Sequence, residues 1–187
     1  VNIGLGLKPD DKLIIYLNED CLPLARLVSK KAFQKGVIDI RLEFNDDIMA
    51  LERFLFAPDQ ALEFFPAYRV EYMENLLKDG YNRLSLLAED PDLLKPVDPA
   101  RIATWQRTAG KAMKPLQKYT MENKVKWCVV GVACPAWAKA VFPELPAEEG
   151  MRKLWDNIFA ATRADLDDPV QAWKGHDASL KARKNFL

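Results

Sequence analysis

VKWCVVGVACPAWAKAVFP, residues 125–143, is the stretch of this sequence that decides the fold. Its first part, residues 127–133, is an unbroken apolar run rich in valine, the pattern of a parallel β-strand that is buried on both faces. Pro135 suits the first turn of a helix, where the missing N–H would have no partner in any case. The stretch therefore predicts a doubly buried strand, a tight turn, and a short amphipathic helix over 136–142 that Pro143 ends.

Three further strands are predicted before this one, over residues 13–16, 37–44 and 83–88, and each is followed by helical sequence. Asp20, the segment Asn45-Asp46-Asp47 and Asp98 are placed to cap the helices that follow them, and Gly36 suits a helix end. The order of strands and helices predicts an α/β fold with a mostly parallel open sheet of about four to five strands, helices on both faces and three layers.

Composition limits the classes of protein that this chain can be. A hydrophobic fraction of 49% over 187 residues is that of a globular domain with a core. Lysine plus arginine and aspartate plus glutamate number 27 each, so no excess of positive charge favours nucleic acid as a partner. Charged residues interrupt every apolar segment, and we therefore expect no membrane span.

The cysteines indicate the cellular compartment of the protein, and the chain ends indicate whether the sequence is a whole protein. Three scattered cysteines argue against a disulfide framework and for a reducing compartment, and the N-terminus lacks the order of a signal peptide. We expect a cytoplasmic protein. Because the chain opens on Val1 and closes on KARKNFL within a helical pattern, we interpret residues 1–187 as a single domain of something longer.

Acidic residues follow the predicted strands, in the segments Asn18-Glu19-Asp20, Asn45-Asp46-Asp47 and Glu89-Asp90-Pro91-Asp92. One interpretation is a rim at one edge of the sheet that attracts a cation, either a substrate ammonium or a metal. The other is that aspartate and asparagine cap helices there, because the helix dipole favours a carboxylate. The capping interpretation is the more economical, because it requires no ligand.

Other candidates for chemistry are few. His176 is the only histidine, so a transition-metal site is hard to assemble within this chain. Cys134, at a helix start, could be a nucleophile of lowered pKa, but no histidine lies near it in the sequence; Cys128 is predicted to be a buried apolar residue. Gly4-x-Gly6 precedes its strand and so fails as a dinucleotide loop. We assign no catalytic, cofactor-binding or metal-binding residue to this chain.

Four motifs together resemble one known family. They are Trp127-Cys-Val-Val-Gly-Val-Ala-Cys-Pro-Ala-Trp-Ala138, Glu89-Asp-Pro-Asp-Leu-Leu-Lys95, Leu154-Trp-x-x-Ile-Phe159 and Asp168-Pro-Val-x-Ala-Trp-x-x-His176. The similarity is to the aminopeptidase T, aminopeptidase S and aminopeptidase II family of metal-dependent exopeptidases. It runs in order over nearly the whole chain and covers roughly the N-terminal half of such an enzyme.

The resemblance implies a hydrolase that removes N-terminal residues from peptides with two divalent ions, described for the family as cobalt, zinc or magnesium. It also implies a homodimer whose active sites face a shared interior cavity. The family's Glu, His, Asp and Tyr metal ligands belong to its second half, so none has a counterpart here. This chain would be an N-terminal α/β domain that shapes substrate access and is inactive without its C-terminal catalytic domain.

Two interpretations from other classes stay open at this point. The chain could be a free-standing α/β module that binds a small anion at the helix start of Cys134-Pro135. It could also be a non-catalytic scaffold that dimerises or packs on a partner.

Overall fold

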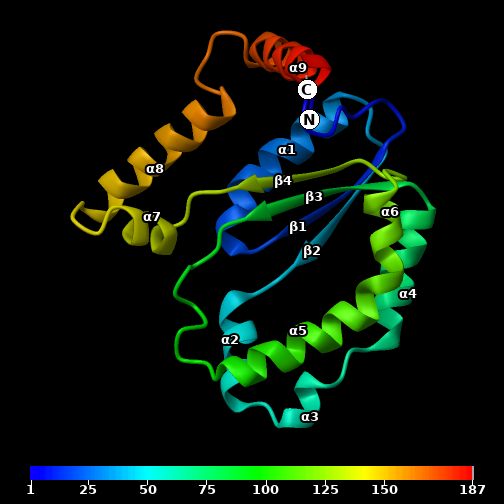
Figure 1. Ribbon diagram of the computed structural model, residues 1–187, viewed down its shortest axis with the longest axis vertical. Helices are drawn as coiled ribbons and strands as arrows, with labels where there is room; N and C mark the ends of the chain where they lie inside the picture. The colour runs from blue at the N-terminus through cyan, green and yellow to red at the C-terminus, as the bar shows by residue number, and fades with distance from the viewer. Residues whose placement is uncertain (187) are drawn as a thin grey trace.

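A computed structural model describes residues 1–186 as a four-stranded parallel sheet with helices on both faces (Figure 1). The strands are β1 (Lys12–Leu17), β2 (Asp39–Phe44), β3 (Tyr81–Leu87) and β4 (Trp127–Gly131). Their order in the sheet is β2-β1-β3-β4, and every neighbouring pair is parallel. The predicted fold class, an open parallel sheet in three layers, is confirmed.

The helices follow the strands in the predicted order. Their bounds are α1 (Leu22–Gln34), α2 (Asp47–Phe56), α3 (Asp59–Leu62), α4 (Ala67–Lys78), α5 (Pro99–Met113), α6 (Gln117–Met121), α7 (Pro135–Val141), α8 (Ala147–Thr162) and α9 (Pro169–Phe186), with 3₁₀ turns at Glu19–Cys21 and Lys114–Leu116. Within residues 1–186, none of these helices has both the length and the apolar character that crossing a membrane requires.

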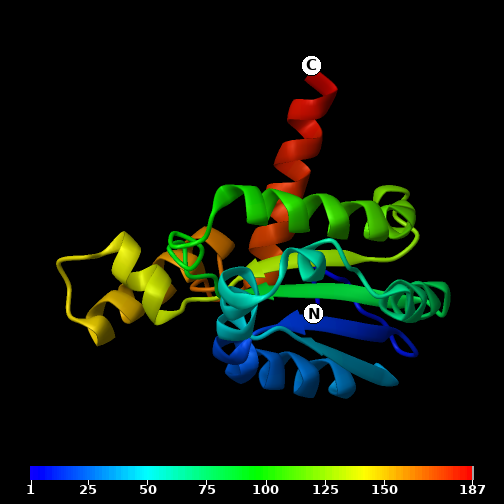
Figure 2. The same cartoon turned by 90° about the horizontal axis from the view of Figure 1, so that it is seen from below.

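The main core lies between the sheet and α1, on what we call the back face. Leu13, Ile15 and Leu17 of β1 point to this face and are at most 2% exposed. Opposite them pack the small buried residues Ala25 and Ala32 of α1, which let the helix approach the sheet closely. Figure 2 shows α1 on one side of the sheet and α5 on the other.

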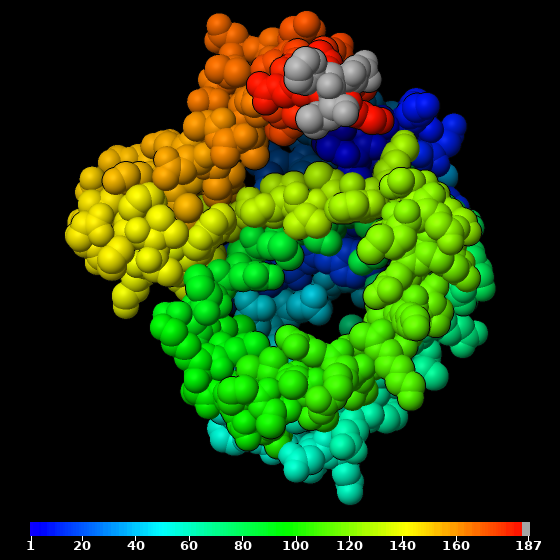
Figure 3. Space-filling view, in the orientation of Figure 1, coloured from blue at the N-terminus to red at the C-terminus, as the bar shows by residue number. Residues whose placement is uncertain are grey.

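The opposite face, which we call the front face, carries Tyr16, Arg83 and Trp127 and is covered only in part. Tyr16, near the carboxyl end of β1, packs against an apolar cluster that includes Met73 of α4 and Tyr119 of α6. A separate apolar cluster joins α2, α3 and α5 away from the sheet. The helices therefore arch over the front face, and Figure 3 shows the molecule hollowed between β3, β4 and α5.

Short-range sequence features predicted the ends of several helices correctly. Asp46 caps α2, its Oδ1 accepting a hydrogen bond of 2.7 Å from the Met49 amide, and Asp98 caps α5 in the same way. Gly36 follows α1 with φ +92°, a conformation that only glycine adopts without strain. The helix predicted over 136–142 begins one residue earlier, with Pro135 in its first turn.

Two predictions about individual elements are wrong. Asp20 does not cap α1, because it lies in the 3₁₀ turn Glu19–Cys21 and Cys21 occupies the N-cap position. The valine-rich strand is not buried on both faces, because β4 is an edge strand with one open face. Trp127 is 53% exposed and Val129 is 52% exposed, both on the front face.

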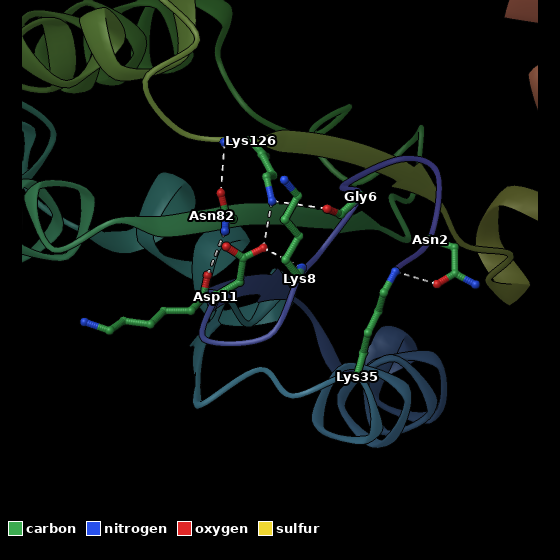
Figure 4. A network of polar contacts seen from close by, with 8 residues as sticks. Asn2, Gly6, Lys8, Asp11, Lys35, Asn82 and Lys126 are labelled. Atoms are coloured by element: carbon green, nitrogen blue, oxygen red, sulfur yellow. Dashed lines mark hydrogen bonds and ion pairs between the residues drawn. The ribbon is translucent and has the colours of Figure 1, made fainter.

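A polar network ties the amino ends of β1, β3 and β4 together (Figure 4). The buried Asn82 side chain donates to the Lys12 carbonyl at 3.2 Å and accepts from the Lys126 amide at 3.0 Å. The Lys126 ammonium donates to Asp11 Oδ2 at 2.7 Å and to the Gly6 carbonyl at 3.2 Å. Burial raises the pKa of Asp11, but the hydrogen bonds from Lys126 and from the Lys8 amide outweigh it, so the pKa lies below its usual value.

Candidate functional site

The carboxyl ends of the four strands meet at one edge of the sheet, where open α/β folds usually bind their ligands. The chain leaves β1 toward β2 on one side and later returns past β1 to form β3 on the other. The point where the order reverses therefore lies between the ends of β1 and β3. In a sheet of this topology it is the first place to look for a ligand crevice.

Asn18, the residue after β1, occupies this point. Its Nδ2 donates to the Ala88 carbonyl at the end of β3 at 2.8 Å, and to Asp47 Oδ2 at 2.9 Å. The residue is 9% exposed, and its side-chain Oδ1 is buried without a hydrogen-bond partner within residues 1–186. The carboxamide thus bridges the two strand ends, and the crevice is closed by the protein's own side chain.

The acidic residues at this edge mostly have structural partners. Asp46 caps α2, and Asp47 accepts the hydrogen bond from Asn18. Asp90 Oδ1 accepts from the Asp92 amide at 2.8 Å and so holds the loop after β3. Of the two interpretations of the acidic rim, these contacts support capping and turn formation.

Cys134 is the N-cap residue of α7 and is only 1% exposed. Burial raises the pKa of its thiol, and its Sγ lies 3.6 Å from the Glu89 carbonyl, to which it donates. A buried thiol of raised pKa is a poor nucleophile. The arrangement therefore argues against Cys134 as a catalytic residue.

The other two cysteines are also packing residues. Cys21 is fully buried, and Cys128 is half-buried on the back face of β4. Burial raises the pKa of both thiols. A Cβ atom on Gly4 would lie 2.8 Å from the Cys128 Sγ, so the N-terminal segment passes directly over this thiol.

His176 belongs to the junction between α8 and α9. Its Nδ1 lies 3.2 Å from an Arg163 guanidinium nitrogen, and its ring meets the Trp173 ring edge-on at 5.6 Å. These two contacts hold the imidazole ring in the junction between the helices. The Trp173 indole N–H donates to the Thr162 carbonyl at 2.8 Å, which completes a structural contact between the helices.

The residues present do not fit a di-metal site. Within residues 1–186 no three His, Cys, Asp or Glu side chains are grouped to hold a metal ion. The histidine is turned to Arg163, and the carboxylates nearest the expected crevice are used by caps and turns. That this chain holds no catalytic residue stays a prediction.

The front face carries the hollows that border the sheet. One pocket of ≈ 200 Å³ lies along β3 and β4, and its lining includes Arg83, Ser85, Trp127 and Val129. A second of ≈ 280 Å³ continues toward the carboxyl edge over Leu87, Gly131 and Trp137. The sequence pattern alone did not predict this surface, although the charged Arg83 at the start of the mostly apolar predicted strand RLSLLA was a signal for it.

Comparison with known proteins adds the family. The family described as "Thermophilic metalloprotease (M29)" matches this chain over residues 1–187. The chain belongs to this family. It is 36% identical over 187 residues to aminopeptidase AmpS of Bacillus subtilis, 37% to aminopeptidase 2 of Geobacillus stearothermophilus and 33% to aminopeptidase T of Thermus thermophilus. The resemblance stated from the sequence is therefore confirmed.

The extent of these matches is as informative as the names. The whole chain is matched in each case, but it spans only 46%, 45% and 46% of the length of these three relatives. The solved structure of wild-type AmpT from Thermus thermophilus superposes with a TM-score of 0.87 at 31% identity, over 98% of this chain and 47% of that one. This M29 chain thus corresponds to about half of an aminopeptidase.

Proposed function

We propose that this chain is the N-terminal domain of a metal-dependent aminopeptidase, which hydrolyses single residues from the N-termini of peptides. The observation that carries the proposal is the match of all 187 residues to the M29 metalloprotease family, with relatives that are named aminopeptidases. The agreement of the fold with AmpT from Thermus thermophilus supports it.

The metal centre of the parent enzyme would lie outside this domain, because the described residues do not fit one. Two divalent ions, which we expect to be cobalt, zinc or magnesium, would activate a water molecule and polarise the scissile carbonyl. The role of this domain is then to form a wall of the substrate cavity. A rigid sheet whose strand ends are tied by Asn18 and Asn82 is suited to that role.

We extend the proposal to assembly and compartment. The parent enzyme would be a homodimer in the cytoplasm, acting on peptides and using neither nucleic acid nor a membrane. The free cysteines and the balanced charge are compatible with this setting. The anion-binding alternative is not proposed, because Cys134 is buried and α7 has only 7 residues.

The test compares two polypeptides in one assay. Residues 1–187 alone, and the polypeptide that continues them through a second half as in the relatives, are incubated with leucine p-nitroanilide and Co²⁺, Zn²⁺ or Mg²⁺. We expect hydrolysis by the longer polypeptide, loss of activity with EDTA, and no hydrolysis by residues 1–187. Metal-dependent turnover by residues 1–187 alone would overturn the assignment of a non-catalytic domain.

A further inference from the structure

The open face of β4 conflicts with its sequence. A valine-rich run without polar alternation belongs to strands that are covered on both sides, yet Trp127 and Val129 are each about half exposed. Their neighbours in register on β3, Arg83 and Ser85, are also incompletely covered. The sequence of β4 is therefore suited to a more buried environment than residues 1–186 provide.

The total accessible surface area of the chain also indicates that part of its surface is suited to being covered. The accessible area is 12381 Å². A folded monomer of 21.3 kDa is expected to expose about 9,100 Å², so the chain exposes about 3,300 Å² more than it should. Part of this excess belongs to α7, α8 and α9, which project from the sheet (Figures 1 and 2). An excess of this size leaves enough surface for an interface with another segment or protein.

A charged side chain on this face indicates what kind of surface could cover it. We define the front strip as six positions on the front face of the paired strands β3 and β4: Arg83, Ser85, Leu87, Trp127, Val129 and Gly131. The Arg83 guanidinium lies 5.0 Å from the Tyr16 ring and has no ion pair within residues 1–186. A cation beside apolar side chains is stabilised when a covering surface supplies a carboxylate.

We propose that the front strip is the docking surface for the second half of the polypeptide, the part that the relatives possess beyond the matched region. The docked segment would cover Trp127 and Val129 with apolar side chains and place a carboxylate on Arg83. More than half of each relative's length is available for this role. The inference rests on the proposed function, because it assumes that this chain is continued by such a half.

A second copy of this chain fits the strip less well. A two-fold interface centred on the strip would bring the same patch of both copies together and so place the two Arg83 guanidinium groups near each other. Like charges in a desolvated interface are destabilising. A segment of different sequence has no such restriction.

The test is a matched pair of substitutions, Val129→Asp and Leu42→Asp. Both residues lie on edge strands and are 52% and 54% exposed, but Leu42 belongs to β2 and points to the back face. In residues 1–187 alone we expect both variants to lower the melting temperature by a similar few degrees. In the full-length polypeptide we expect Val129→Asp to lower it by about 10 °C more than Leu42→Asp, because the new charge is buried without a partner.

Hydrogen exchange of the unmodified protein provides a second measurement that does not depend on folding of a variant. Amides of residues 127–131 should exchange at least tenfold more slowly in the full-length polypeptide than in residues 1–187, while those of residues 39–44 change little. Equal exchange of residues 127–131 in both, or equal melting shifts of the two variants, would overturn the proposal. A dimer of residues 1–187 that dissociates on Val129→Asp would instead assign the strip to a second copy.

These readouts are independent of catalysis. If the full-length polypeptide has no metal-dependent peptidase activity but residues 127–131 become protected, the proposed function fails and the docking surface stands. If activity is present and residues 127–131 stay unprotected, the docking surface alone is wrong.

Discussion

The side-chain amide of Asn18 donates a hydrogen bond of 2.8 Å to the carbonyl of Ala88, a residue 70 positions later in the chain. The bond joins the carboxyl ends of β1 and β3 at the point where the strand order reverses. In many open sheets a ligand occupies this point. Here the carboxamide of Asn18 occupies it and bridges the two strand ends.

Replacing Asn18 by alanine should therefore destabilise the fold. The change removes the hydrogen bonds to Ala88 and Asp47, and we expect a loss of about 1–3 kcal/mol in the free energy of unfolding, measured by urea denaturation. Asn18→Asp should cost more at pH 7, because a second carboxylate then faces Asp47. Near pH 4 the Asn18→Asp variant should recover part of this lost stability. Equal free energies of unfolding for the two variants would show that the amide donor is unimportant.

The ion pair between Asp11 and Lys126 should make the free energy of unfolding depend on pH in the acidic range. The pKa of Asp11 is lowered in the folded state, so the pair stabilises the fold above the unfolded pKa of about 3.9 and loses its effect as pH falls through the lower, folded value. We expect Asp11→Asn to reduce the free energy of unfolding by about 1 kcal/mol at pH 7. The difference from the unmodified chain should shrink steadily below pH 4.

Asp79 provides the control for this experiment. It forms an ion pair of 2.7 Å with Lys12, but its side chain is 60% exposed. Asp79→Asn should therefore change the free energy of unfolding by no more than about 0.5 kcal/mol. If both substitutions change the free energy of unfolding equally, the Asp11–Lys126 pair is no more stabilising than an ordinary surface ion pair, and the network around Asn82 does not strengthen it.

Two glycines should respond in opposite directions to alanine. Gly36 has φ +92°, and a Cβ there would lie 3.1 Å from Pro9, so Gly36→Ala should destabilise the fold by about 1–3 kcal/mol. Gly110 lies within α5, where an added Cβ would meet no atom of residues 1–186 within 4 Å, so Gly110→Ala should stabilise by about 0.5–1 kcal/mol. Thermal melting of both variants checks the signs.

The thiols should be protected in the native chain. Cys21 and Cys134 are 0% and 1% exposed, Cys128 is half-buried, and burial raises the pKa of all three. We expect Ellman's reagent at pH 7.5 to react slowly, with Cys128 first, and to reach all three thiols only in denaturant. Rapid labelling of Cys134 would revive the hypothesis of a reactive thiol at the start of α7.

The elements that the sequence predicted correctly depend on local chemistry. Asp46, Gly36 and Pro135 each mark a helix boundary through their own side chain or backbone, so no knowledge of distant residues is needed. Asn18 and Arg83 could not be assigned in this way. The role of Asn18 requires a partner 70 positions away, and that of Arg83 depends on which strand becomes its neighbour.

The wrong prediction for β4 has a different origin. The apolar run of β4 fits a strand that is covered on both faces, and the proposed docking of a second half, which the relatives possess beyond the matched region, would supply the missing cover. The acidic segments could not be interpreted from the sequence alone for yet another reason. A capping aspartate and a ligand-binding aspartate look alike until hydrogen bonds such as that from the Met49 amide to Asp46 are seen.

The open face of β4 has a consequence for synthesis. If a second half of about 220 residues follows, as we propose, it would leave the ribosome about 10–45 s after this domain at a synthesis rate of about 5–20 residues per second. During that interval Trp127 and Val129 face solvent on a folded sheet. Under the proposed docking, the uncovered front strip would be accessible to chaperones during this interval, and premature release of the nascent chain would leave a folded half with an exposed apolar strip.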